Sequence, residues 1–427
     1  MLKATRRGFL AASAALPATA AMAKAPEDRH ARVADDLAKY IGFGSKNAGG
    51  PGDNACGEWL AGELAGLGFE IERQDVSTPW FEPERCELVS GAATAKIWPQ
   101  PIVVQTGAGG VTGPLVRIDA NRQVSGSLAG AIALIDLPHA RWSTAMVKPF
   151  REPVTAAFAA GAKAVVAITN GPTGKIIALN ADGREPMFAG PVALLAPEDA
   201  KPFLGAAMRG EAATLTVTGK AGRRPAFNFI GRIDRGKKKW LAVSTPRSGW
   251  YGCAGERGPG IAAWLWMARW ASKSVLSHDL AFVCNTGHEY ENLGAAEALK
   301  ATAPPPADTH FWLHLGANVA SRDWHDLTGQ PLPSVDTQRF LSVSPALVPL
   351  ARAVFEGHAG LEAPYTTDML NAGELIEIVA AGYKNVAGVF GLHRYHHVAG
   401  DDARCVHAPL VASTAAAFQQ LIERAIR

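Results

Sequence analysis

The sequence lacks a surplus of charge of either sign. It has 42 Lys and Arg residues against 39 Asp and Glu residues. Lys3, Arg6 and Arg7 lie in the first 23 residues, where there is no acidic residue, so removing that segment leaves 39 residues of each sign. A neutral chain gives no electrostatic support to a role in binding nucleic acid or an anionic membrane surface.

Cysteine is scarce as well. The five cysteines are widely spaced, and no close pair builds a zinc knuckle. They are Cys56, Cys86, Cys253, Cys284 and Cys405. The odd number leaves at least one free thiol or an intermolecular bond, and an oxidising compartment would permit one disulfide, whose partners the sequence does not indicate.

Long hydrophobic runs are also missing, since no stretch supplies the ~20 apolar residues of a membrane span. The alanine-rich segment that ends at Met22 is too short. It follows Thr5-Arg6-Arg7-Gly8-Phe9-Leu10, which is typical of a twin-arginine export signal. Ala21-Met22-Ala23 supplies small residues for cleavage. We predict a signal peptide over residues 1–23 and a periplasmic or secreted protein; a short N-terminal helix is the alternative.

The rest of the chain divides into three zones by pattern. Residues 24–84 are helical and then extended, and residues 85–220 hold short apolar strands separated by Gly, Pro and Asn. Residues 221–427 alternate strands with helices, which predicts a mostly parallel sheet covered on both faces. The expected fold is therefore α/β, a three-layer α/β/α sandwich with a β-rich insert.

Apolar periodicity predicts the individual elements. A helix is expected from Asn54 to Leu67, with Gly68 as its stop. The other expected helices cover residues 154–161, 260–271, 294–301, 347–357, 374–380 and 411–427. The expected strands cover residues 115–118, 131–135, 164–168, 192–195, 227–233, 241–245, 280–284, 310–315 and 386–390. In parallel sheets chemistry gathers at the carboxyl ends of the strands. These ends lie at Thr245, Cys284, Leu315 and Phe390.

The loops after these strands resemble the zinc aminopeptidase and glutamate-carboxypeptidase-like family, the co-catalytic zinc exopeptidases. The stretches that carry this likeness are residues 241–250, 255–262, 287–294, 367–368 and 395–396. Residues 111–116, 128–134 and 159–165 resemble the protease-associated domain often inserted in that family. The resemblance covers nearly the whole mature chain and implies a peptidase-like domain formed by residues 24–84 and 221–427, with a protease-associated-like insert at residues 85–220.

The same resemblance implies a two-zinc site, but this chain lacks the ligands of one of the two metals. Two zinc ions need carboxylate and imidazole ligands and one shared carboxylate. Pro246 and Ser248 stand where the family has its first histidine and aspartate, and a shift by one residue offers only Thr245 and Arg247. The ligand aspartate after the next strand falls near residues 315–316, where no carboxylate stands.

The other metal's shell is better matched. The resemblance places Glu256 at the bridging aspartate, Glu289 at the second glutamate and His396 at the final histidine, with His288 at the catalytic base. We therefore predict either no metal or one zinc ion held by Glu256, Glu289 and His396, and not two. Whether the protein is an enzyme stays open. It is either a pseudo-peptidase that binds peptides or small molecules in the cleft, or a mononuclear-metal or metal-free hydrolase of amide or ester bonds with His288 as base.

Three other interpretations concern the same residues. Glu256 can form an ion pair with an arginine instead of binding a metal. His396 and His397 are expected to point to opposite faces of an extended segment, so that at most one of them faces the site, with His396 preferred over His397. A nucleophilic Ser248 or Cys253 lacks the Gly-x-Ser-x-Gly context of such hydrolases. The candidate pocket residues are Arg247, Ser248, Trp250, Arg257, Asp368 and Tyr395.

Overall fold

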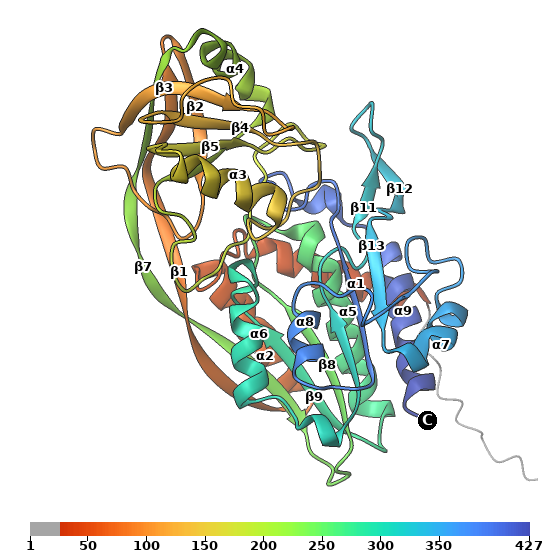
Figure 1. Cartoon of the computed structure of the whole chain (residues 1–427). Coiled ribbons are helices and arrows are strands. Elements are labelled where there is room, and N and C mark those ends of the chain that lie inside the picture. Colours follow the sequence, from red (N-terminus) through yellow and green to blue (C-terminus); the bar gives the residue numbers. More distant parts are fainter. Residues whose placement is uncertain (1–25) are drawn as a thin grey trace, which may run out of the picture.

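The computed structural model describes residues 26–427, so the predicted signal peptide lies outside the described residues. Figure 1 shows an upper lobe and a larger lower lobe, connected by two long strands. No helix within residues 26–427 is both long enough and apolar enough to cross a membrane.

The helices and strands follow the alternation expected from the sequence. The helices are α1 (Pro26–Gly42), α2 (Pro51–Gly66), α3 (Lys148–Ala159), α4 (Ala200–Arg209), α5 (Ala254–Ser274), α6 (Leu293–Ala301), α7 (Val348–Val354), α8 (Leu375–Ala380) and α9 (Ala408–Ala425). The strands are β1 (Glu70–Ser90), β2 (Ala93–Pro99), β3 (Val111–Ile118), β4 (Ile132–Asp136), β5 (Ala164–Ile168), β6 (Val192–Leu195), β7 (Ala212–Ile233), β8 (Trp240–Pro246), β9 (Asp279–Asn285), β10 (Thr309–Leu315), β11 (Arg322–Trp324), β12 (Pro331–Val335), β13 (Arg339–Val343), β14 (Tyr365–Thr366) and β15 (Val386–Gly391).

One sheet of 13 strands runs through the described part of the chain in the order β1-β2-β6-β5-β4-β3-β7-β9-β8-β10-β15-β13-β14. The strands β9, β8, β10 and β15 are parallel to one another, and so are β3, β4, β5 and β6. The strand β7 lies between these two parallel groups and is antiparallel to β9 on one side and to β3 on the other. The pairs β1–β2 and β13–β15 are also antiparallel. The expected α/β fold is confirmed, with a sheet that is mixed overall and parallel in its two central groups.

The strands β1 and β7 pair along almost their whole length, from Glu70 opposite Arg232 to Val89 opposite Thr214. Their lower ends pack in a core that contains Trp264. At their upper ends they contribute to a separate core with β3, β4 and β5. The proposed boundaries between residues 84 and 85 and between residues 220 and 221 therefore fall within single continuous strands.

The start of α5 shows why some element ends could not be predicted. The sequence predicted this helix from Gly260, but it begins at Ala254. Asp401, from a distant loop, accepts hydrogen bonds from the backbone N–H groups of Gly255 and Glu256 at 2.6 and 3.0 Å. A carboxylate at a helix N-terminus satisfies unpaired N–H groups and stabilises the helix dipole.

All five cysteines are free thiols. Four of them are buried, and Cys86 is half-buried. The single disulfide that the sequence left open is not formed.

Candidate functional site

The site lies where β8 and β9 end side by side. Pro246 at the end of β8 is in register with Asn285 at the end of β9. After β9 the chain turns at Gly287, whose φ of 75° suits glycine, into a one-turn helix over His288–Tyr290. This register brings the loop that leads to α5 next to the loop that carries His288 and Glu289, as expected at the carboxyl ends of parallel strands.

Glu256 lies in the first turn of α5 and is fully buried. Its Oε1 lies 2.7 Å from Nη2 of Arg257 and 3.3 Å from Nε2 of His397. Burial raises the pKa of Glu256, but Arg257, His397 and His396 outweigh it and hold that pKa well below its usual value. The carboxylate is therefore ionised, and it forms the ion pair with an arginine that the sequence offered as an alternative to metal binding.

His396 and His397 both face Glu256. Their rings stack with centroids 3.9 Å apart, and one nitrogen of each lies in a group with a Glu256 oxygen, all within 4.8 Å of one another. The expectation that only one of them would face the site was wrong. The backbone at His397 is left-handed, with φ 58°, so the segment is not extended there and neighbouring side chains do not alternate.

Both carboxylate oxygens of Glu289 accept hydrogen bonds from the protein, and Glu289 lies outside the group formed by Glu256, His396 and His397. Its Oε2 accepts a hydrogen bond from Ser248 Oγ at 2.7 Å, and its Oε1 accepts one from the Ala48 N–H at 2.7 Å. The Ser248 hydroxyl also accepts the N–H of Gly287 at 2.8 Å. Burial raises the pKa of Glu289 to about 7. The structure thus places His397, and not Glu289, beside Glu256 and His396.

The donor types of this group permit zinc, but a buried arginine stands beside its carboxylate. One carboxylate and two imidazoles form a common zinc set. His397 also contacts the Ala178 carbonyl oxygen through Nδ1 at 2.9 Å, the kind of contact that orients metal-binding histidines. Arg257, however, already supplies a positive charge to the Glu256 carboxylate. A cation bound there would lie against a fixed guanidinium group.

His288 faces a carboxylate that the sequence reasoning missed. Nδ1 of His288 lies 3.8 Å from Oε1 of Glu374, which is longer than a direct hydrogen bond. Oε2 of Glu374 accepts a hydrogen bond from Asn285 Nδ2 at 3.0 Å. Burial lowers the pKa of His288, and so does the nearby Arg257. The sequence placed Glu374 at the start of a helix, and nothing in that position signalled that its side chain faces the strand ends.

The other predicted pocket residues are dispersed. Arg247 is fully buried and pairs with Asp53 at 2.9 Å, not with Glu256. Asp368 is exposed in the loop after β14. Tyr395 packs against Trp324, with ring centroids 4.7 Å apart. The structure therefore brings together only part of the predicted set.

We call the group around Glu256 the polar chamber; it contains six side chains that are buried or nearly so. They are Glu256, Arg257, His288, Glu374, His396 and His397. Seven of their buried atoms have no aligned hydrogen-bond partner: both oxygens of Glu256, both terminal nitrogens of Arg257, Nδ1 of His288 and of His396, and Oε1 of Glu374. Buried polar atoms are normally paired, so this concentration is typical of a place where a ligand or water completes the network.

The upper lobe covers the polar chamber with residues 177–181. The Ala178 N–H donates to the His397 carbonyl at 3.0 Å, and the Ala181 N–H donates to the Glu289 carbonyl at 3.1 Å. Asn180 accepts a hydrogen bond from Trp250 Nε1 at 2.9 Å. Five of the six chamber side chains are at most 4% exposed, and His288 has 11% of its side chain exposed.

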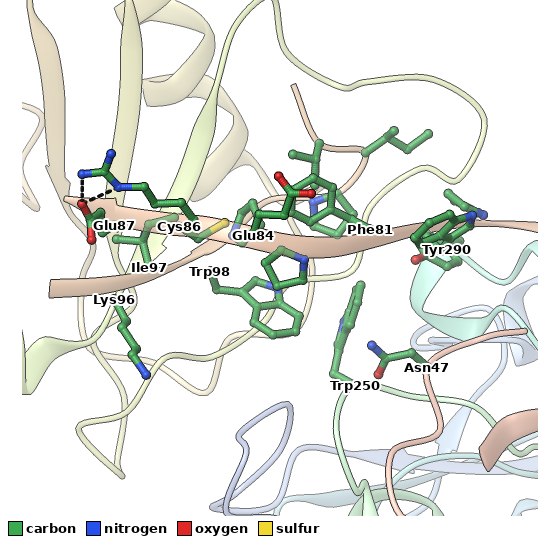
Figure 2. A pocket seen from close by; sticks show the side chains of 18 of the residues that line it. Asn47, Phe81, Glu84, Cys86, Glu87, Lys96, Ile97, Trp98, Trp250 and Tyr290 are labelled. Carbon is green, nitrogen blue, oxygen red and sulfur yellow. Dashed lines mark hydrogen bonds and ion pairs between the residues drawn. The ribbon is translucent and has the colours of Figure 1, made fainter. Parts of the chain in front are cut away.

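A pocket of about 560 Å³ lies beside this site (Figure 2). It is lined by β1 and β2 of the upper lobe and by Trp250 and Tyr290 of the lower lobe. Trp250 lies edge-on to both Trp98 and Tyr290, with centroids 5.9 Å apart in each case. The volume of the pocket lies within the ~300–1,000 Å³ range of small-molecule sites. Trp250, two residues after Ser248, connects this aromatic pocket to the chamber loops.

The fold is that of the zinc aminopeptidases. A zinc aminopeptidase from Bacillus subtilis has a TM-score of 0.71 and 16% sequence identity, over 93% of this chain and 94% of that one. An aminopeptidase from Aneurinibacillus sp. strain AM-1 has a TM-score of 0.66 and 17% identity, over 94% and 96%. A peptidase M28 precursor from Shewanella amazonensis SB2B has a TM-score of 0.66 and 15% identity, over 93% and 96%. No family model and no curated protein sequence matches the chain. At these identities the likeness shows the fold alone.

Proposed function

We propose that this protein is a relative of the zinc aminopeptidases that does not work as a dinuclear zinc peptidase, and that it binds a peptide or small molecule in its cleft. The observation that carries the proposal is the contact of 2.7 Å between Arg257 Nη2 and Glu256 Oε1, with both side chains fully buried. The positive charge that a metal would bring to Glu256 is already present as part of the chain.

The size of the electrostatic effect supports this proposal. Two unit charges ~4 Å apart interact by about 4 kcal/mol at an effective dielectric constant of ~20, so a divalent cation at that distance from Arg257 would be repelled by roughly 8 kcal/mol. Structural zinc sites bind with about 10–16 kcal/mol. The repulsion would therefore remove half or more of the affinity of such a site.

The sequence departures agree with this proposal. Pro246 can ligate nothing, and Ser248 is engaged by Glu289. Residues 315–316 are Leu and Gly, so no carboxylate stands there. With Glu289 also turned toward Ser248, neither of the two ancestral metal positions keeps its full set of ligands.

Export and domain organisation complete the proposal. The twin-arginine pattern in residues 1–23 supports delivery to the periplasm or beyond. The separate hydrophobic core above β1 and β7 supports a protease-associated-like insert at residues 85–220. The aromatic pocket between the two lobes supplies space for a ligand.

Metal analysis tests the proposal. Protein purified from zinc-supplemented medium should contain well under one zinc per chain. Arg257→Gln should bind zinc more tightly in a competition with a chromogenic chelator, because Glu256 loses its internal cation. Arg73→Gln, which changes an exposed arginine on β1, serves as the control and should bind no more zinc than the parent. Two zinc ions per chain, together with chelator-sensitive aminopeptidase activity in the parent, would refute the proposal.

A second candidate function is hydrolysis of an amide or ester bond with one metal ion or none. The observation that favours the metal-free form is the pair of unpartnered atoms, His288 Nδ1 and Glu374 Oε1, that face each other in the polar chamber.

A further inference from the structure

We propose that Glu374 positions His288 as a general base and that Arg257 stabilises the developing oxyanion, so that the polar chamber hydrolyses an ester or amide without metal. This inference rests on the proposed absence of a zinc pair and goes beyond ligand binding.

Glu374 is held so that one oxygen is fixed and the other is free. It is 1% exposed and lies just before α8. Asn285, at the end of β9, holds Oε2 at 3.0 Å, while Oε1 is directed at the His288 ring and has no hydrogen-bond partner. Burial raises the pKa of Glu374, but its hydrogen bonds and the nearby His288 and His314 outweigh burial and lower it. Glu374 is therefore an ionised acceptor for one ring nitrogen.

His288 is the chamber residue nearest to solvent, with 11% of its side chain exposed. Its backbone N–H donates to Ser248 Oγ at 3.3 Å, which fixes the loop, and a Cβ at position 373 would lie 3.4 Å from its Cε1. When Nδ1 carries the proton that faces Glu374, Nε2 has a free lone pair. A histidine oriented by a carboxylate in this way accepts a proton through its other nitrogen.

Arg257 supplies the fixed positive charge. Its Nε donates to the Ser248 carbonyl at 3.1 Å, which anchors the guanidinium group. Both terminal nitrogens have no aligned acceptor even though Glu256 is close. Preorganised donors aimed at a developing negative charge in a dry site are a strong source of transition-state stabilisation.

These groups account for every proton in the reaction. His288 Nε2 takes a proton from a water molecule as its oxygen bonds to the carbonyl carbon. The carbonyl π electrons move to oxygen, next to Arg257. When the oxyanion collapses, the bond to the alcohol or amine breaks, and the imidazolium returns its proton to that leaving group. Ser248 is not the nucleophile, because its hydroxyl donates to Glu289 and accepts two backbone N–H groups.

The experiment uses the full mature protein after treatment with EDTA, with p-nitrophenyl acetate and a set of aminoacyl p-nitroanilides as probes. The parent should exceed the buffer rate with at least one probe. Glu374→Gln should lower kcat about tenfold or more with little change in KM, and His288→Gln should lower it by about 10²-fold or more. The double variant should lose little beyond His288→Gln, since the two residues act as one unit. Glu374→Asp should recover part of kcat.

Glu377→Gln, on the same helix α8 but outside the chamber, is the matched control and should keep the parent rate. Circular dichroism and Tm confirm folding of each variant. The proposal that Glu374 and His288 act as a catalytic dyad is refuted by either of two results. One is that the EDTA-treated parent shows no hydrolysis above buffer with any probe. The other is that Glu374→Gln and His288→Gln hydrolyse as fast as the parent. Zinc measured in the same samples separates the two ideas. Zinc-dependent activity overturns the metal-free proposal, whereas a metal-free enzyme that is indifferent to Glu374 overturns the dyad alone.

Discussion

Removal of the buried carboxylate of Asp53 should strongly destabilise the protein. Asp53 in α2 and Arg247 after β8 are both 0% exposed and lie 2.9 Å apart. Asp53 Oδ2 also accepts hydrogen bonds from the Gly49 N–H at 2.8 Å and the Thr286 hydroxyl at 2.7 Å. Loss of one member of a buried ion pair leaves the other charge uncompensated and costs about 3–5 kcal/mol. Asp53→Asn should therefore lower the free energy of unfolding by about that amount.

Helix α2 also offers a matched control. Glu58 pairs with Arg73 through a hydrogen bond of 2.6 Å, but the two side chains are 53% and 49% exposed. Exposed pairs contribute only about 0–1 kcal/mol. With a urea slope of about 3 kcal/mol/M, Asp53→Asn should lower the unfolding midpoint by about 1–2 M and Glu58→Gln by less than about 0.3 M. Urea unfolding followed by tryptophan fluorescence and by circular dichroism measures both. Equal midpoints for the two variants would contradict the reasoning.

Three further predictions concern other parts of the molecule. The pKa of Glu289, raised to about 7 by burial, means that the folded state binds more protons than the unfolded state between about pH 4.5 and 7. Stability should therefore fall by about 3 kcal/mol as pH rises through this window, and Glu289→Gln should flatten that part of the pH–stability curve. Gly294→Ala should destabilise by about 1–3 kcal/mol or more, because its Cβ would collide with the Thr286 carbonyl oxygen. Gly62→Ala, with nothing near its Cβ, should instead raise Tm slightly. Trp98→Ala should weaken binding of an apolar peptide amide by about tenfold in a fluorescence titration, since Trp98 lines the aromatic pocket.

The elements that the sequence predicted best are the buried parallel strands. Residues 164–168 and 192–195 coincide with β5 and β6. Such strands read as short apolar runs between turns because both of their faces are covered. The same logic located the loops after β8 and β9. The resemblance to the zinc exopeptidases, and not periodicity, then singled out Glu256, His288 and Glu289 within them.

The parts that the sequence could not predict depend on contacts between distant segments. Glu374 meets His288 only because α8 packs across the end of β9. The side chain of His397 faces Glu256 because the backbone of His397 itself is left-handed. The residue at this turn is not a glycine, so the local sequence does not predict the turn. The partner of Arg247 is Asp53, nearly two hundred residues earlier in the chain. Periodicity reports which face of an element is buried, and it does not report which polar groups meet there.

The pairing of β1 with β7 makes the upper lobe separable at a defined place. Because β1 and β7 form one ladder from Glu70–Arg232 up to Val89–Thr214, the chain enters and leaves the upper lobe side by side, and Val89 and Thr214 mark the upper end of that ladder. A short hairpin turn spliced between those two residues would keep the register below it unchanged. The same deletion would take away residues 177–181, so a shortened protein would show how far the chamber opens once its cover is gone.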